Sequence, residues 1–187
     1  MPKPIPDFDE MWAYFPTGES EEVKDRIGGG VDADHITNTC VIRVSRCLNY
    51  TGHAIPKNSE EFVTKLGKDK KWYGLRVKEF KTYMLKKYGK PTLKHTYDGD
   101  GGPAPEEFKN RRGIIMFDVR VWEDATGHFT LWNGKTCADK CYFDKTKEVW
   151  LWAEKRKPSE VSLAAGALAK LVTKLSGEII EATLTKR

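Results

Sequence analysis

The sequence predicts an α+β domain in which a helical first half packs against an antiparallel sheet. Apolar residues recur at helical spacing in the first ninety residues, whereas short runs rich in valine, isoleucine, phenylalanine and tryptophan follow after residue 112. The chain has 187 residues, of which 11% are aromatic, so it can form one domain with a packed core. Disorder is therefore not expected.

Three helices follow from the spacing of apolar residues. They cover residues 8–15, 40–49 and 77–88, and a glycine or proline follows each of them within three residues. The second helix has the best-defined start, because residues 37–39 are Thr-Asn-Thr and all three types are good N-cap residues.

Outside these three helices the sequence predicts one more helix and two loops. Asn58 and Glu61 make a start like a capping box, so a short helix is expected from residue 58. Residues 18–35 form a polar stretch, in which the three glycines at 28–30 are expected to be a flexible loop, and the Gly/Asp/Pro cluster at 98–103 is expected to be a surface loop. The three glycines at 28–30 lack a following Gly-Lys-Ser/Thr, so they do not predict a phosphate-binding loop.

Three strands are predicted in the second half of the chain. Residues 114–117 form a buried run, residues 128–132 are rich in strand-forming types, and residues 149–152 follow after several turn residues. An Asn-Gly turn at 133–134 comes directly after the second of these strands. Antiparallel strands that follow a helical half give the α+β class.

Charge and hydropathy exclude several functions. The net charge is +5, and the last 35 residues supply +3 of it, so no clustered basic face for nucleic acid is expected. The opening residues lack the apolar run of a signal peptide, and no stretch is long and apolar enough for a membrane span. We expect a domain over residues 1–157 and an amphipathic helical extension over 158–187, which packs back on the domain in preference to dimerising or aiding delivery.

Cys40 and His128 are the candidate catalytic pair. Cys40 lies in the first turn of a predicted helix, where the helix macrodipole favours a thiolate. His128 lies in a predicted strand far along the chain. A cysteine at a helix N-terminus that meets a histidine from a distant strand is the arrangement of papain-like cysteine hydrolases. Cys47 lies two turns deeper on the same helix face and is expected to be reduced and buried.

Cys137, Asp139 and Cys141 form a second cluster with two interpretations. The two cysteines can contribute to a zinc site, but such a site needs four ligands and no second spaced pair is apparent. In an oxidising compartment a disulfide across this five-residue loop is the better interpretation, with a contribution of about 2 kcal/mol. Asp139 follows His128 by eleven residues and could return to the imidazole and fix its tautomer. No metal or other cofactor is expected.

Four blocks of the sequence carry a family resemblance. They are FDEMW at 8–12, NTCVIRVSRCLN at 38–49, GLRV at 74–77 and GHFTLWNGKTC at 127–137. The blocks are similar to the fourth family of type VI secretion amidase effectors, and the similarity runs from about residue 8 to residue 152. Because the blocks include the candidate cysteine and histidine, the resemblance extends to the proposed site.

The resemblance implies a papain-like fold of the NlpC type and cleavage of the bond between D-glutamate and meso-diaminopimelate in peptidoglycan stem peptides. It implies Cys40 as nucleophile, His128 as base and Asp139 as the orienting acid, with a disulfide between Cys137 and Cys141. Members of this family are injected by the type VI secretion apparatus into the periplasm of another bacterium, and a cognate immunity protein blocks the cleft. Direct injection explains why no signal peptide is needed.

Substrate contacts and other functions stay open at this point. The stem peptide carries several carboxylates, so arginines at positions Arg43, Arg46, Arg111 and Arg112 are candidates for holding it. The backbone amide of Cys40 is expected among the donors to the oxyanion. The alternatives are a thiol acyltransferase or deamidase that uses the same three residues, and a non-enzymatic wall-binding module with purely structural cysteines.

Overall fold

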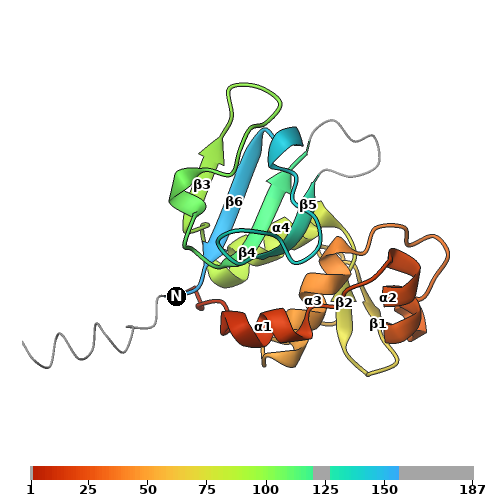
Figure 1. Ribbon diagram of the computed structural model, residues 1–187. Coiled ribbons are helices and arrows are strands. Elements are labelled where there is room, and N and C mark those ends of the chain that lie inside the picture. Colours follow the sequence, from red (N-terminus) through yellow and green to blue (C-terminus); the bar gives the residue numbers. More distant parts are fainter. Residues whose placement is uncertain (1, 120–126, 156–187) are drawn as a thin grey trace, which may run out of the picture. The chain divides into compact units, whose positions relative to one another are not determined.

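The structure, a computed structural model, describes residues 2–119 and 127–155 (Figure 1). Within them the helices come first and a four-stranded sheet follows, which confirms the predicted α+β class. In chain order the elements are α1 (Phe8–Tyr14), α2 (Ser20–Ile27), α3 (Cys40–Tyr50), β1 (Thr64–Leu66), β2 (Trp72–Gly74), α4 (Val77–Tyr88), β3 (Leu93–Thr96), β4 (Gly113–Asp118), β5 (His128–Trp132) and β6 (Glu148–Ala153).

The four-stranded sheet has the strand order β3-β6-β4-β5, and each neighbouring pair is antiparallel. The three predicted strands are confirmed as β4, β5 and β6. The sequence pattern does not predict β3, because this strand has no fully buried residue and contains Lys94 and His95. β5 lies at the edge of the sheet, and its pairing with β4 sets His128 opposite Phe117.

Two glycines allow the strands to approach closely. At Gly113 a Cβ atom would lie 2.0 Å from the carbonyl oxygen of Trp152. Gly127 has a φ of +151°, and a Cβ atom there would lie 2.3 Å from the carbonyl oxygen of Phe117. Because Gly127 directly precedes His128, a glycine at this position preserves the register that positions the histidine.

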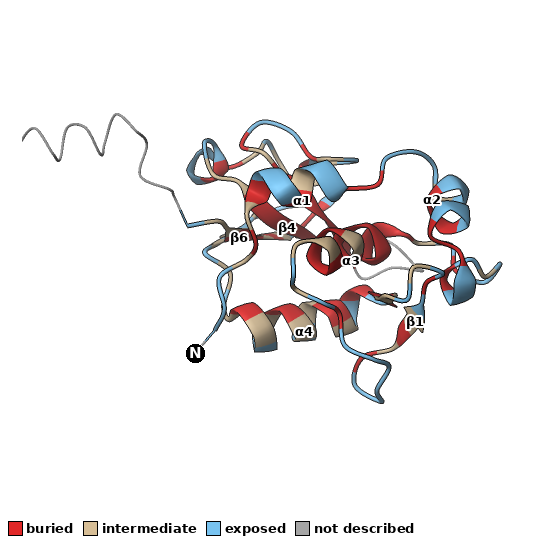
Figure 2. Cartoon of the chain, turned by 90° about the horizontal axis from the view of Figure 1, so that it is seen from below, coloured by how far each residue is buried: buried red, intermediate tan, exposed pale blue. Residues whose placement is uncertain are grey.

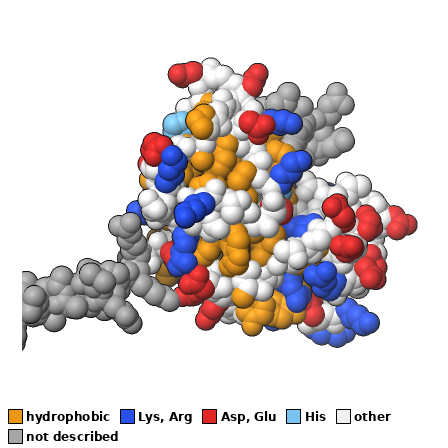
Figure 3. Space-filling view, in the orientation of Figure 1, with side chains coloured by type: hydrophobic (Ala, Val, Ile, Leu, Met, Phe, Trp, Pro, Cys, Tyr) orange, Lys and Arg blue, Asp and Glu red, His pale blue; other side chains and the backbone are white. Residues whose placement is uncertain are grey.

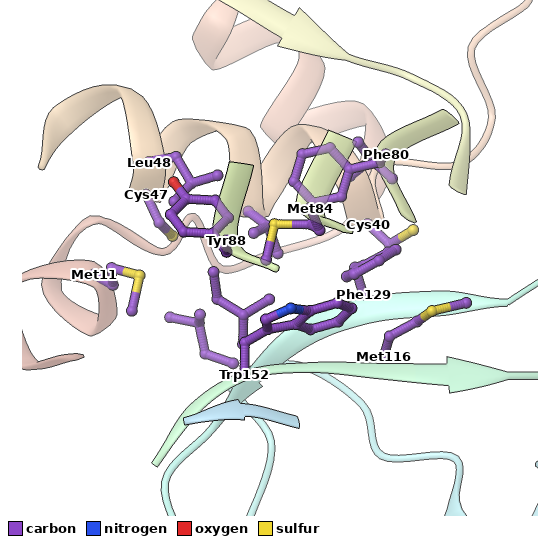
Figure 4. Packing of buried hydrophobic residues seen from close by; sticks show 14 of the residues in the cluster. Met11, Cys40, Cys47, Leu48, Phe80, Met84, Tyr88, Met116, Phe129 and Trp152 are labelled. Carbon is purple, nitrogen blue, oxygen red and sulfur yellow. The ribbon is translucent and has the colours of Figure 1, made fainter. Parts of the chain in front are cut away.

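Helix α3 is the centre of the hydrophobic core. Val41, Val44, Cys47 and Leu48 have no exposed surface. Figure 2 shows this helix buried among α1, α4 and the sheet, and Figure 4 shows its side chains facing Trp152 of β6. Full burial of a side chain such as Leu48 contributes about 1.5–3 kcal/mol, so the packing anchors α3 firmly against the sheet.

The polar stretch at residues 18–35 contains a helix, α2, which the sequence pattern does not predict. A capping box between Glu19 and Glu22 satisfies the first amides of this helix. Val23 and Ile27 are buried and belong to a small core cluster that also includes part of α3. Charged residues separate these two apolar positions, so the sequence shows only a weak helical period.

The prediction of a helix from Asn58 is wrong. Residues 64–66 form β1, which pairs antiparallel with β2. The side-chain oxygen of Asn58 accepts a hydrogen bond from the backbone amide of Thr64 at 2.9 Å, instead of capping a first helical turn. Val63 and Thr64 are both β-branched, and such residues favour extended backbone.

Two further predictions concern the surface and the C-terminus. The predicted loop at 98–103 contains neither helix nor strand, as expected. The amphipathic extension predicted at 158–187 lies outside the described residues, as does its boundary with the predicted domain at 1–157. Among the residues that the structure describes, no helix combines the length and the apolar character needed to span a membrane.

Candidate active site

Cys40 is the first residue of α3 and lies at one end of the core. It is a free cysteine and only 3% exposed. Figure 4 shows its side chain beside Phe129 of β5, the residue that follows His128. The backbone amide of Cys40 donates a hydrogen bond to Oδ1 of Asn38 at 3.0 Å. This amide is therefore occupied, in contrast to the expectation that it is free to stabilise an oxyanion.

A cavity of about 450 Å³ opens at this end of α3, and its walls include Cys40, His128 and Asp139. The segment after α1, the starts of α2 and α3, the start of β5 and the loop after β5 all contribute to it. The structure thus brings together all three residues that the sequence predicts as catalytic.

The loop after β5 carries Asp139 back to His128. The chain turns at 133–136 and then runs back along the strand, with the amide of Ala138 donating to the carbonyl of Leu131 at 2.9 Å. This returning segment places Oδ1 of Asp139 3.2 Å from Nε2 of His128. The Asp139 side chain is 21% exposed and the His128 side chain 10%. His128 and Asp139, which are eleven residues apart in the sequence, are thereby joined by a hydrogen bond.

The partners of His128 favour its protonated form. Burial opposes the charge, but the hydrogen bonds to Asp139 and Cys40, and the negative charges of these groups, raise the pKa of His128 to about 9. Because Nε2 contacts Asp139, Nδ1 is the ring nitrogen that remains for the Cys40 thiol. The site therefore places a protonated imidazole beside the Cys40 side chain.

Asp139 is held in its ionised form. Burial favours the neutral acid, but the hydrogen bond and charge interaction with His128 lower the pKa of the carboxyl group below its usual value. The buried Thr130 hydroxyl, for which the described residues offer no hydrogen bond of ordinary geometry, lies close enough to the carboxylate to add to this effect. A charged carboxylate can orient the imidazole and stabilise its positive charge.

Cys137 and Cys141 form a disulfide, with 5.5 Å between their Cα atoms, as predicted. Because the two sulfur atoms bond each other, this pair does not serve as zinc ligands. The disulfide closes the loop that contains Asp139, whose side chain also accepts a hydrogen bond from the Lys140 amide at 2.6 Å. Among the described residues, no group of three or more histidine, cysteine or acidic side chains is arranged to hold a metal ion.

Removing the disulfide is expected to lower both stability and activity. A Cys137→Ser, Cys141→Ser variant should lose about 2 kcal/mol of unfolding free energy, as the loop-entropy relation gives for a five-residue loop. Because Asp139 would be held less firmly, kcat should fall by about 10- to 100-fold. Urea denaturation measures the loss of stability, and an assay of catalytic turnover measures the loss of activity. Wild-type protein treated with reductant should behave like the variant, and unchanged values for both quantities would contradict the prediction.

The predicted arginines differ in their positions. Arg43 lines the cavity, but its guanidinium donates to the carbonyls of Pro16 and Gly18, both at 2.7 Å, and thereby holds a cavity wall in place. Arg46 lies over the Tyr50 ring at 4.4 Å and does not line the cavity.

Arg111 and Arg112 also lie outside the walls of this cavity. Arg112 binds Asp9 and Glu154. Substrate binding by any of the four predicted arginines stays a prediction, and only Arg43 is positioned beside the proposed catalytic residues.

Sequence reasoning missed several residues of the cavity wall. Lys140 and Tyr142 lie beside Asp139, with the Lys140 ammonium 5.4 Å from the Tyr142 ring centre. Their closeness to Asp139 in the sequence could have indicated that they line the same cavity. Glu19 and Ser20 also line the cavity, and they are found only once α2 is known.

Comparisons with known proteins identify the family of this chain. The family model of type VI secretion system (T6SS) amidase effector protein 4 matches residues 36–152, which include all three proposed catalytic residues. The effector Tae4 from Enterobacter cloacae is similar at a TM-score of 0.74 and 34% identity, over 83% of this chain and 100% of that chain. The Tae4–Tai4 effector–immunity complex from Salmonella Typhimurium gives 0.72 and 33%, over 80% and 99%. A search of curated proteins gave no match. The chain therefore belongs to the family of type VI secretion system amidase effector protein 4.

Proposed function

We propose that this amidase effector hydrolyses the bond between D-glutamate and meso-diaminopimelate in the stem peptides of peptidoglycan. Family membership gives the general reaction, and the sequence resemblance gives the bond. The observation that carries the proposal is the cavity in which the Cys40 thiol, the His128 imidazole and the Asp139 carboxylate meet. A nucleophile, a base that exchanges protons with it and a third group that orients the base are the parts of a nucleophilic amide hydrolase.

The reaction follows from the groups in the cavity. The Cys40 thiolate attacks the side-chain carbonyl carbon of D-glutamate, and the negative charge that develops on the oxygen lies near the N-terminus of α3. His128 then gives its proton to the departing amine of diaminopimelate, which leaves a thioester on Cys40. Water, deprotonated by His128, attacks the thioester, which releases the shortened stem that ends in D-glutamate and restores the thiolate. Asp139 orients the imidazole throughout.

Activity is expected to fall on the alkaline side, with a midpoint near pH 9. The departing amine needs a proton from His128, whose pKa is raised from 6.5 to about 9, so the neutral form above this pH cannot supply it. Stability should follow the same direction: because the folded pKa exceeds the unfolded one, the contribution of the charged histidine is complete below pH 6.5 and is lost as the pH rises through about 9. Initial rates and thermal unfolding across this range measure both trends, and a flat rate profile through pH 9 would contradict the role of His128.

The proposed destination is the periplasm of a target bacterium, reached through the type VI secretion apparatus. The disulfide between Cys137 and Cys141 supports this destination, because disulfides persist in oxidising compartments. The solved relatives include complexes of Tae4 with the immunity protein Tai4. By analogy, a cognate immunity protein in the producing cell covers the cavity of this effector.

Incubation of the purified protein with muropeptides, followed by mass spectrometry, tests the proposed function. Stems shortened to L-alanyl-D-glutamate are the expected product. Transfer of the acyl group to an added amine would identify an acyltransferase, and conversion of an amide to an acid without chain cleavage would identify a deamidase. Unchanged muropeptides together with retention on cell-wall sacculi would favour a wall-binding module and contradict the proposal.

A further inference from the structure

A second cavity, which we call the α1 cavity, lies near the opposite end of β5 from His128. Its volume is about 300 Å³. Helix α1 provides one wall, and the turn after β5 provides another. Its lining residues are Phe8, Asp9, Trp12, Arg112, Asn133 and Lys135. None of the proposed catalytic residues belongs to it.

One wall of the α1 cavity combines an aromatic surface with charges that are already paired. Trp12 is half-buried, and its ring packs against Phe8 with 5.4 Å between the ring centres. Arg112 lies 4.8 Å from the centre of the Phe8 ring. The Arg112 guanidinium also binds Asp9 at 2.7 Å and Glu154 at 2.6 Å. A charged ligand would have to compete with these pairs, whereas a neutral ligand would not.

The other wall offers hydrogen-bond donors from a fixed turn. Oδ1 of Asn133 accepts hydrogen bonds from the amides of Lys135 and Thr136, at 2.9 and 2.8 Å. These bonds hold the turn and leave the Nδ2 group of Asn133 as the donor end of that side chain. Lys135 is exposed, and its ammonium forms no ion pair with any residue that the structure describes.

We propose that the α1 cavity binds an amino-sugar ring of the peptidoglycan glycan strand. A sugar ring has an apolar C–H face that packs on an aromatic ring such as Trp12, and hydroxyl and acetamido groups that accept hydrogen bonds from donors such as Asn133 and Lys135. The sugar is neutral, which matches a wall whose charges are paired. This inference rests on the proposed function, because that function makes the glycan strand part of the substrate.

The position of the α1 cavity fits a substrate in which peptide and glycan are joined. His128 and Asn133 are five residues apart along β5, so the two cavities lie about 17 Å apart at about 3.4 Å per residue. From the scissile bond, the D-glutamate, the L-alanine and the lactyl group span about 10 Å when extended. The first two sugars of the strand therefore lie within reach of the α1 cavity. Figure 3 shows hydrophobic side chains running down the face of the molecule that is seen in the orientation of Figure 1, with lysines and arginines on both flanks.

A comparison of two substrates, one with and one without the disaccharide, distinguishes the loss of a sugar site from a general loss of activity. The preference of the enzyme for a disaccharide-tetrapeptide over the same free tetrapeptide is measured as a ratio of kcat/KM values. Trp12→Ala should lower this ratio about 10-fold, and Trp12→Phe, which keeps an aromatic ring, should restore most of it. Asn133→Asp keeps the acceptor that holds the turn but removes the donor group, so it should also lower the ratio of the two kcat/KM values, as Trp12→Ala does. Tyr14→Ala is the matched control on the same helix, because Tyr14 is 41% exposed and lines neither cavity.

A binding measurement tests the inference independently of catalysis. The disaccharide of N-acetylglucosamine and N-acetylmuramic acid, with its lactyl carboxyl group amidated so that the probe is neutral like the sugar in the glycan strand, should bind to the wild-type protein in a calorimetric titration. Trp12→Ala should weaken this binding about 10-fold. An unchanged substrate ratio in Trp12→Ala, or absence of disaccharide binding, would overturn the inference. A ratio that responds to Lys135→Ala alone would also overturn it, because a peptide carboxylate would then occupy the cavity. Failure of the proposed function would give a different result, because the wild-type protein would then cleave neither substrate. The binding measurement would still show whether the α1 cavity binds the sugar.

Discussion

The Cys40→Ala variant is expected to lose amidase activity, with kcat lowered by at least about 10⁴-fold. None of the other three cysteines can replace Cys40, because Cys47 is fully buried and Cys137 and Cys141 are bonded to each other. Mass spectrometry of muropeptide digests measures the loss. The variant should keep its fold, because the removed sulfur lies at the cavity end of the core.

Cys47→Ala is the matched control for this experiment. Cys47 lies on the same helix, its thiol donates to the carbonyl of Arg43 at 3.3 Å, and burial raises its pKa well above the usual range. This thiol can neither reach the cavity nor ionise at neutral pH. Cys47→Ala should therefore keep kcat while losing about 1 kcal/mol of stability. Turnover by Cys40→Ala, or its loss in a folded Cys47→Ala, would show that the nucleophile is another group.

The Asp139→Asn variant is expected to lower kcat by about 10³- to 10⁴-fold. The amide cannot hold the imidazole in the same tautomer, and it removes one of the two negative charges that stabilise the His128 imidazolium. The alkaline limb of the rate profile should accordingly move from about pH 9 toward 6.5, the ordinary value for histidine. A pH–rate profile of the residual activity measures this shift, which a general loss of folding would not produce.

Asp144→Asn tests whether the effect is specific to the site. Asp144 is five residues further along the chain, is exposed and does not line the cavity. Its replacement by asparagine should leave both kcat and the alkaline limb unchanged. An Asp139→Asn variant that behaves like this control would remove Asp139 from the proposed catalytic residues.

The sequence predicts the parts of the site whose signals are local and strong. The N-cap types before Cys40 mark the start of α3, and the strand-forming residues around His128 mark β5. Both patterns depend only on residues that are neighbours in the chain, so they can be recognised without knowledge of the fold. The disulfide was expected from the spacing of two cysteines and from the family resemblance, and the structure has it.

The remaining features depend on contacts between distant segments. The propensities of residues 58–66 suggest a helix start, but pairing with β2 turns part of this stretch into β1. The buried face of α2 can be identified only from its contact with α3, which the sequence alone does not show. Arg43 has the charge expected of a substrate-binding residue, yet the carbonyls that its guanidinium contacts come from a segment more than twenty residues away. Such contacts leave no periodic pattern in the sequence.

The burial of α3 implies that the proposed catalytic residues belong to regions of different local stability. The amide hydrogens of α3, in the middle of the core, should exchange with solvent only through global unfolding. The segment that returns Asp139 to His128 has few backbone hydrogen bonds and should exchange through local opening. As temperature rises, Asp139 should therefore separate from His128 before α3 melts, and the enzyme should lose activity before it loses its helical signal.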